Sequence, residues 1–240
     1  INYYDTAYVY PGSEAELGEI FSKNGIREEV YIATKLPHYL IKSANTIEKL
    51  FSEELERLRT DYIDYYLMHM LADCATWERL LALGLGEWLE EKKKSGAIRQ
   101  VGFSYHGNTD MFCRLVDAYD WDFCQIQYNY MDTNEQAGDK GYALCEKLNV
   151  PIVIMEPIKG GALASFAPEV EEMFKAVRPE KSIASWALRW VASKPQVKVV
   201  LSGMSTEEQV KDNLDTFGNF EALSEKELES AKHFWKTMHF

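Results

Sequence analysis

The most constraining feature of this 240-residue sequence is a repeated alternation of short apolar runs with longer segments of helical spacing. Seven runs rich in β-branched and aromatic residues are predicted as strands: 1–4, 29–34, 62–68, 98–104, 122–128, 151–155 and 197–201. Helices are predicted over 13–24, 43–59, 77–95, 109–119, 138–148, two pieces ending near 193, 206–214 and 224–238. Regular helices between short strands indicate right-handed βαβ units and a parallel sheet.

Polar residues end nearly every predicted strand: Asp5, Lys35, His69, Ser104, Gln125, Glu156 and Ser202. A doubly wound open sheet also holds seven strands, but its ligand crevice lies at one switch point. A barrel whose carboxyl-end rim carries site residues all around explains the pattern better. We therefore predict an α/β fold, a (β/α)8 TIM barrel that lacks its N-terminal βα unit in this sequence. The predicted barrel is a single domain over residues 1–240, with its last helix at about 224–238.

Composition narrows the class of protein. The formal net charge of −12 opposes a nucleic-acid surface, which requires clustered Lys and Arg. No apolar run approaches the roughly 18 residues of a membrane span. The four cysteines form no C-x-x-C pair and no zinc-type spacing, and the sequence shows no signal peptide. We therefore expect a cytoplasmic protein with reduced thiols, no bound metal, and neither nucleic acid nor membrane as a partner.

Four polar residues form a candidate catalytic set: Asp5, Tyr10, Lys35 and His69. If the first three strands are parallel neighbours, these side chains meet at one end of the sheet. A lysine ammonium about 4 Å from a phenolate stabilises it by roughly 4 kcal/mol at an effective dielectric near 20, which lowers the tyrosine pKa by up to about three units. That shift moves Tyr10 toward the range of a general acid. Asp5 would hold Lys35 charged, and His69 would hydrogen-bond a substrate oxygen.

Proton donation to a carbonyl oxygen needs a separate source of hydride. No side chain supplies hydride, so a nicotinamide cofactor, NADP(H) or NAD(H), is implied. The sequence contains neither a G-x-G-x-x-G fingerprint after a strand nor a phosphate-binding P-loop. The dinucleotide is therefore expected on the rim, with its phosphates near Gly160-Gly161 and near the helix that follows residues 202–205.

Several motifs in order give the sequence a specific resemblance to a known family. They are NYYDTA (2–7) with Tyr10, ATK (33–35), DYID (61–64) before His69, IRQVGFS (98–104), QIQYN (125–129), PIKGG (157–161) and GMS (203–205) followed by Gln209 and Asn213. Through these motifs, nearly the whole chain resembles the aldo-keto reductase superfamily. It also resembles a branch whose members often carry a cysteine-rich iron–sulfur extension after the barrel, and this sequence has no such extension.

The resemblance implies a function and assigns residues to it. It implies reduction of a small aldehyde or ketone, with the four candidate catalytic residues as the family's tetrad and Tyr10 as the acid. Ser104 and Gln125 fall at the nicotinamide amide, and the segment 203–213 falls at the adenosine phosphate. The predicted cofactor-binding set is Ser104, Gln125, Met155, Pro157, Ile158, Gly203, Ser205, Gln209 and Asn213.

The sequence departs from the family pattern in three places. Met155 replaces a tyrosine that often stacks on the nicotinamide, and Tyr105 replaces an asparagine that often follows the serine. Gly203 and Gln209 replace the Lys and Arg of many NADPH-preferring members, cations that would pair with a 2′-phosphate. NADH and NADPH are therefore both open.

Two other functions are open on the sequence alone. The same fold with the same cofactor also serves as a regulatory or interaction module with little or no turnover. A parallel barrel also permits a Schiff-base aldolase at Lys35, although the neighbouring Asp5 opposes this chemistry by keeping the lysine charged.

Overall fold

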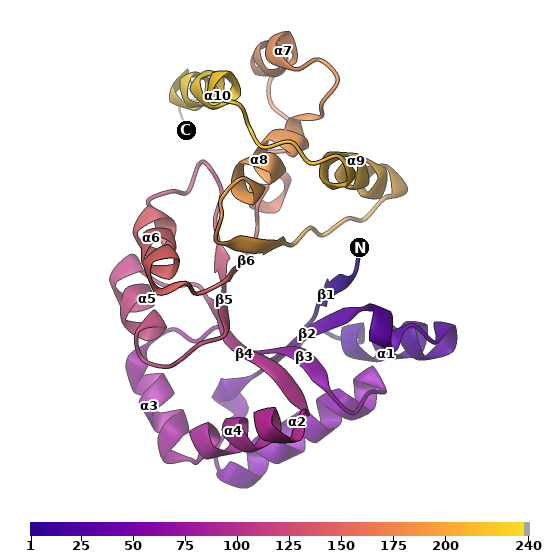
Figure 1. The fold of residues 1–240 in the computed structure, drawn as a ribbon, viewed down its shortest axis with the longest axis vertical. Coiled ribbons are helices and arrows are strands. Elements are labelled where there is room, and N and C mark those ends of the chain that lie inside the picture. The colour runs from indigo at the N-terminus through magenta and orange to yellow at the C-terminus, as the bar shows by residue number, and fades with distance from the viewer. Residues whose placement is uncertain (238–240) are drawn as a thin grey trace. The chain divides into compact units, whose positions relative to one another are not determined.

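The computed structural model describes residues 1–237, with side chains through residue 232. Seven strands lie in these residues and follow one another in chain order, with helices between them (Figure 1). The chain divides into two compact units, residues 1–125 and 126–240, and each is described by itself. The strand β5 (Phe123–Gln127) crosses the boundary between them.

Unit 1 is built on a parallel sheet. Its strands pair in the order β1 (Tyr3–Asp5), β2 (Tyr31–Leu36), β3 (Ile63–Met68) and β4 (Ile98–Tyr105). Its helices are α1 (Ser13–Asn24), α2 (Ala44–Leu58), α3 (Cys74–Ala82), α4 (Leu85–Ser95) and α5 (Thr109–Val116), with short 3-10 turns η1 (Arg27–Glu29) and η2 (His38–Leu40). Because the strands are parallel neighbours, the carboxyl ends of β1, β2 and β3 lie side by side.

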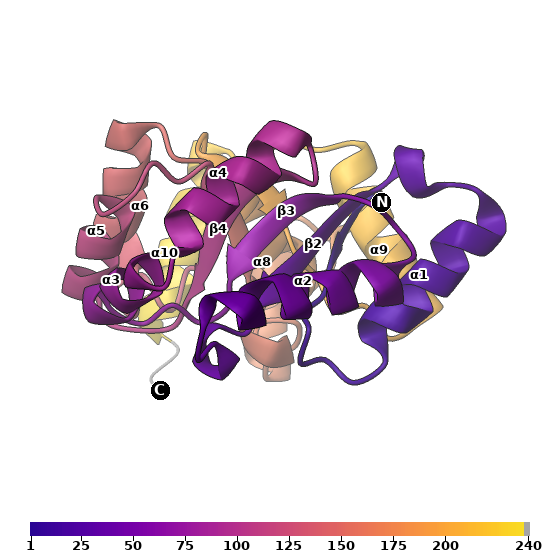
Figure 2. The ribbon, with the colours of Figure 1, turned by 90° about the horizontal axis from the view of Figure 1, so that it is seen from below.

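The helices of unit 1 pack through apolar stripes set by the helical period. The α2 stripe of Ile47, Leu50, Phe51 and Leu58 is buried. Helix α2 contacts both β2 and α1, α4 contacts β4, and Figure 2 shows these helices alongside the strands. The α1–α2 contact requires Gly18, because a Cβ there would lie 2.3 Å from the carbonyl oxygen of Arg57. This close packing brings the first turn of α1 near β2.

The segment 77–95, predicted as mostly helix, is mostly helical, and it is divided between two helices, α3 and α4, within residues 74–95. The chain breaks at Gly84, which has a left-handed backbone with φ of 88°. Glycine adopts this conformation without the steric cost that a Cβ brings, so the apolar spacing continues across a turn that ends the first helix. The other predicted strands and helices of unit 1 are confirmed to within a few residues.

Unit 2 contains a parallel strand pair, β6 (Ile152–Met155) and β7 (Val197–Val200). Its helical elements are α6 (Gly138–Leu148), η3 (Lys159–Gly161), α7 (Pro168–Val177), α8 (Ile183–Ala192), α9 (Glu207–Gly218) and α10 (Glu225–Thr237). The predicted helix 206–214 thus continues to residue 218. The predicted last helix is confirmed over 225–237, and residue 238 lies outside the described residues.

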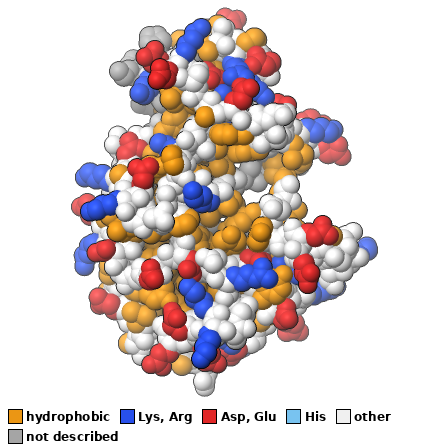
Figure 3. Space-filling view, viewed as in Figure 1, with side chains coloured by type: hydrophobic (Ala, Val, Ile, Leu, Met, Phe, Trp, Pro, Cys, Tyr) orange, Lys and Arg blue, Asp and Glu red, His pale blue; other side chains and the backbone are white. Residues whose placement is uncertain are grey.

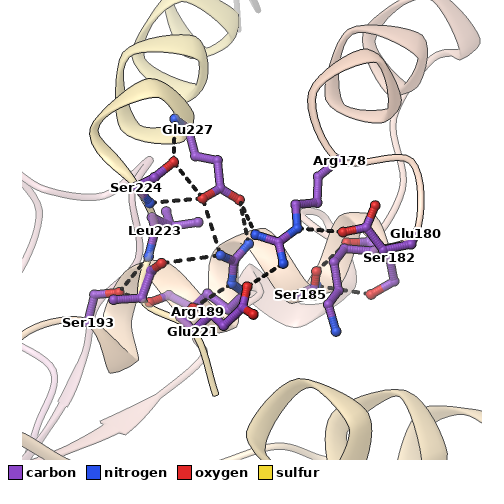
Figure 4. A network of polar contacts seen from close by, with 12 residues as sticks. Arg178, Glu180, Ser182, Ser185, Arg189, Ser193, Glu221, Leu223, Ser224 and Glu227 are labelled. Carbon is purple, nitrogen blue, oxygen red and sulfur yellow. Dashed lines mark hydrogen bonds and ion pairs between the residues drawn. The ribbon is translucent and has the colours of Figure 1, made fainter. Parts of the chain in front are cut away.

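An apolar cluster packs α8 with α7 and α10: Phe174 of α7, Ile183 and Trp186 of α8, Leu223, and Ala231 of α10. Beside it, Arg189 of α8 donates hydrogen bonds to the Glu227 carboxylate of α10, at 2.8 and 3.3 Å (Figure 4). Both side chains are nearly inaccessible to solvent, at 1% and 5% exposure. Arg178 adds a third charge at 3.5 Å from Glu227. These contacts join α8 and α10 through both apolar and ionic groups.

The surface carries charges of both signs. On the face shown in Figure 3, Lys and Arg side chains are interspersed with Asp and Glu side chains. None of the helices in residues 1–237 is both long enough and apolar enough to cross a membrane. The four cysteines, all within the described residues, form no disulfide.

Candidate active site

The centre of the site is a buried ion pair between neighbouring strands. Asp5 pairs in register with Ala33, so Lys35 lies two residues further along β2, on the same face of the sheet. The Lys35 Nζ donates hydrogen bonds to Asp5 Oδ2 at 2.7 Å and to the carbonyl oxygen of Thr6 at 2.6 Å. The lysine side chain is only 1% exposed. The carboxylate and carbonyl oxygens around Nζ favour the ammonium form, and this geometry opposes a Schiff-base role.

Tyr10 lies on the outer side of this ion pair. The turn after β1 positions it, with its backbone N–H donating to the carbonyl oxygen of Ala7 at 2.9 Å. The Lys35 Nζ lies 5.2 Å from the centroid of the Tyr10 ring. The ring of His69, which follows β3, lies edge-on to Tyr10 at 5.9 Å between centroids. The structure therefore brings all four predicted residues, Asp5 included, into one place.

Burial works against both charges of the ion pair. It raises the pKa of Asp5, and the Lys35 charge and hydrogen bond oppose that rise. It lowers the pKa of Lys35, and the Asp5 charge opposes that fall, with a further contribution from Glu14. The lysine thus depends on the carboxylates around it to remain a cation.

The pKa of Tyr10 shifts in the direction opposite to the sequence-based expectation. Burial of the phenol raises it, and the Asp5 carboxylate raises it further. The prediction that Lys35 lowers this pKa is therefore wrong for the structure. The physical reason is that Asp5 lies 2.7 Å from the lysine nitrogen and balances its charge. The phenol is therefore next to an ion pair rather than a lone cation. A tyrosine with a raised pKa carries its proton throughout the neutral range.

His69 is a neutral imidazole at neutral pH. Burial lowers its pKa to about 4, and the charges of Lys35, His38 and His106 act in the same direction. Its Nδ1 is buried without a hydrogen-bond partner in the part of the chain that the structure describes. A neutral imidazole has one N–H to donate, which suits contact with a carbonyl oxygen.

Ser104 and Gln125, predicted at the nicotinamide amide, are both buried in unit 1, Ser104 near the end of β4 and Gln125 in the middle of β5. The Ser104 hydroxyl oxygen accepts a hydrogen bond from the backbone N–H of Met70 at 2.9 Å, which leaves its own proton to donate. Gln125 hydrogen-bonds the Asp5 carboxylate, which places its side chain beside the ion pair. A hydroxyl donor and a primary amide at this position fit the carboxamide of a nicotinamide.

The remaining predicted cofactor residues belong to unit 2. Met155 and Ile158 are half-buried and Pro157 is buried, around the end of β6. Gly203 and Ser205 are exposed in the loop before α9. The Gln209 side-chain oxygen accepts from the backbone N–H groups of Ser205, at 2.7 Å, and of Thr206, at 3.3 Å, and the second bond is part of a capping box with Thr206. Asn213 donates to the Ser202 hydroxyl at 2.9 Å, which ties α9 to the preceding loop.

The sequence alone does not identify two functional candidates, His38 and Glu14. His38 is buried, lies 3.3 Å from the Met70 carbonyl oxygen, and its charge acts on His69. Glu14 is 2% exposed and lines a cavity of about 340 Å³ with Tyr8, Tyr10, Pro11, Gly12, Ala15 and Arg57. A carboxylate in the first turn of a helix is an ordinary partner of the helix dipole, so its position in the sequence gives no signal.

A phenol, a buried cation, a carboxylate and a neutral imidazole thus form one polar cluster at adjoining strand ends of a parallel α/β protein. Residues 1–236 match the model of the Aldo/keto reductase family, and the chain belongs to this family. The predicted fold class, α/β of the (β/α)8 type, is thereby confirmed, as is the enzyme class, an NAD(P)H-dependent oxidoreductase. Within residues 1–237, no cluster of His, Cys, Asp and Glu side chains could hold a metal ion.

Three similar proteins show how far the likeness extends. "Uncharacterized oxidoreductase YqkF" of Bacillus subtilis is 25% identical, over 98% of this chain and 84% of its own length. The holo form of aldo-keto reductase AKR11C1 from Bacillus halodurans is 25% identical with a TM-score of 0.76, over 98% of this chain and 82% of that one. An aldo-keto reductase from Klebsiella pneumoniae in complex with NADPH shares the fold at 22% identity and a TM-score of 0.74, over 98% and 80%.

Proposed function

We propose that this protein reduces a small aldehyde or ketone to an alcohol, with Tyr10 as the proton donor. The observation that carries the proposal is the Lys35 ammonium, 1% exposed and held by Asp5, beneath the Tyr10 ring and close to His69. The Lys35 cation next to the phenol opposes the effect of burial and of the Asp5 carboxylate on the phenolate that remains after proton transfer. Asp5 keeps the cation in place.

The chemistry divides between cofactor and protein. The bound nicotinamide supplies a hydride to the carbonyl carbon. Tyr10 gives its O–H proton to the carbonyl oxygen, so one C–H bond and one O–H bond form as the carbonyl π bond breaks. Because the pKa of Tyr10 is raised, the proton is present at neutral pH before the reaction. The Tyr10 side chain is 42% exposed, so water can return the proton after each turnover.

The other residues of unit 1 bind and orient. The neutral His69 donates its N–H to the carbonyl oxygen and thereby directs it toward Tyr10. Ser104 and Gln125 hold the carboxamide of the cofactor, since one offers a hydroxyl proton and the other an amide. These roles follow from the residues' chemistry and from their places around the ion pair.

The protein is further proposed to accept NADH at least as well as NADPH. The loop before α9 has Gly203, and the Gln209 side chain is occupied by the helix cap. The first turn of α9 carries Glu207 and Glu208, both exposed, and Lys211 pairs with Glu207 at 3.3 Å. A 2′-phosphate at this loop would therefore lie near carboxylates, whereas a guanidinium or an ammonium is the group that would stabilise it.

The test is Tyr10→Phe, which removes the acid and keeps the ring. We expect turnover of a panel of small aldehydes and ketones to fall at least about 100-fold. NADH binding, followed by quenching of its fluorescence, should stay close to that of the wild type. Tyr31→Phe is the matched control. Tyr31 is about as exposed as Tyr10, and it is the first residue of β2, whereas Lys35 lies near the other end of that strand.

Two outcomes would contradict the proposal. Unchanged turnover in Tyr10→Phe would mean that another group donates the proton. Cofactor binding by the wild type without turnover of any carbonyl in the panel would favour a regulatory nicotinamide-binding module.

A further inference from the structure

We propose that Glu14 is a positioning residue of the proton-transfer site, which fixes Lys35 through Thr34 and keeps it charged. The inference rests on the proposed role of Lys35 and adds a residue that touches neither substrate nor cofactor. Three observations support the inference: the contacts of Glu14 with β2, the contacts of Glu14 with α2, and the charges around Lys35.

The first contact is with the strand that bears the lysine. Glu14 Oε1 accepts a hydrogen bond from the Thr34 hydroxyl at 2.5 Å, and both side chains are buried. Thr34 and Lys35 are adjacent on β2, so their side chains point to opposite faces of the sheet. Glu14 therefore holds the outer face of the strand at the position where the inner face presents the ammonium. A shift of Thr34 would move Lys35 with it.

The second contact fixes Glu14 itself. Its Oε2 accepts a hydrogen bond from Arg57 Nη1 of α2 at 3.2 Å, and the same nitrogen donates to the Tyr8 carbonyl oxygen. The carboxylate is thus held by a hydroxyl on one oxygen and a guanidinium on the other. Arg57 also lies beside the Tyr8 ring, at 4.2 Å from its centroid. Glu14, Tyr10 and Arg57 line the same cavity, which connects this support to the proton donor.

The third observation is the balance of charge around Lys35. Asp5 on β1, Tyr10 after β1 and His69 after β3 are the charged or titratable groups that face Lys35. Behind the strand are Glu14 on α1 and Glu54 and Arg57 on α2. Burial raises the pKa of Glu54 well above its usual value, and this carboxyl accepts a hydrogen bond from Tyr66 at 2.6 Å. The charges of Asp5 and Glu14 raise the pKa of Lys35. Burial raises the pKa of Glu14 itself, and its hydrogen bonds with Thr34 and Arg57 oppose that rise.

The decisive measurement is the pKa of the Lys35 ammonium, followed by NMR of ¹³C-labelled lysine and assigned with Lys35→Arg. In Glu14→Gln the amide oxygen still accepts from Thr34 but the charge is gone. We expect the Lys35 pKa to fall by about 0.5 unit or more. Glu16→Gln, an exposed glutamate of the same helix, should leave it unchanged. This readout needs no turnover, so it stands apart from the test of Tyr10.

A second pair of variants tests the mechanical connection. Thr34→Val keeps the shape of the side chain and removes the hydroxyl, and Thr34→Ser restores it. With NADH and 4-nitrobenzaldehyde, Thr34→Val should lose about tenfold in kcat with KM nearly unchanged, and Thr34→Ser should recover most of it. An unchanged Lys35 pKa in Glu14→Gln overturns the proposal. If Glu14→Gln does not fold, the Thr34 pair decides, and an unchanged kcat in Thr34→Val overturns it.

Discussion

His69 is a buried imidazole, and its neutrality has a consequence for stability. Its pKa is lowered to about 4 in the fold, against about 6.5 in the unfolded chain. The unfolded state therefore binds more protons between these values, and folding stability falls as the pH drops below about 6.5. From pH 7 to pH 5 this residue alone should remove about 2 kcal/mol from the free energy of unfolding.

Chemical denaturation of the wild type and of His69→Gln at both pH values measures this contribution. The variant should lose less stability than the wild type on acidification, by about that amount. His106→Gln, at an exposed histidine whose charge acts on His69, should change the acid sensitivity less than His69→Gln does. Equal acid sensitivity of the wild type and His69→Gln would show that the imidazole titrates near its ordinary pKa.

At the residue scale, the sequence predicts which side chains meet but not their electrostatics. Asp5 and Lys35 meet because parallel pairing sets their register, and this pairing is readable from consecutive strands. The direction of the Tyr10 pKa shift is not readable, because it depends on how closely Asp5 neutralises Lys35. Glu14 is likewise invisible in the sequence, since its role depends on a bond to the outer face of β2.

At the scale of elements, the ion pair between α8 and α10 makes a testable contribution to stability. Burial raises the pKa of Glu227, but hydrogen bonds from Arg189 and Ser224 outweigh this and lower it to about 2. A depressed carboxyl pKa means that the stabilisation is present above about pH 4.5 and is lost as the pH falls through about 2. Glu227→Gln leaves Arg189 buried without its counter-ion, which should cost about 3 kcal/mol at pH 7.

Glu180→Gln provides the comparison for this pair. Glu180 also pairs with an arginine, Arg178, at 2.5 Å, but its side chain is 57% exposed. Exposed ion pairs contribute at most about 1 kcal/mol, so this variant should unfold nearly as the wild type does. Equal losses in both variants, measured by urea denaturation, would show that burial does not set the strength of the contact.

The order and type of the elements were predictable because apolar period distinguishes strands from amphipathic helices over several residues. The division between α3 and α4 was not, since it depends on the left-handed conformation of one residue, Gly84. Glycine is tolerated inside helical patterns and also ends helices, and periodicity does not distinguish these cases. The extension of α9 to residue 218 was missed for a related reason: its last turn exposes Phe217, which departs from the amphipathic pattern.

At the scale of the whole molecule, net charge bears on cofactor choice. The chain carries a formal charge of −12, and its Lys and Arg side chains are interspersed with acidic ones (Figure 3). A ligand with more negative charge approaches such a protein against a less favourable field, and salt screens this effect over about 8–10 Å. NADPH carries an additional phosphate relative to NADH. The whole-molecule field and the acidic first turn of α9 therefore act in the same direction.

Binding of the cofactor to the folded chain should raise its melting temperature, and this shift compares the two nucleotides without turnover. At 100 times its dissociation constant, a ligand adds about 2.7 kcal/mol, which corresponds to roughly 5–10 °C for a chain of this size. We expect NADH to give at least the shift of NADPH at equal concentration.

Gly203→Lys places a cation where a Cβ meets open space, so NADPH affinity should rise about fivefold or more while NADH affinity changes little. Gly218→Lys, at an equally open position at the far end of α9, should leave both unchanged, and a larger shift with NADPH in the wild type would mean that another cation binds the 2′-phosphate.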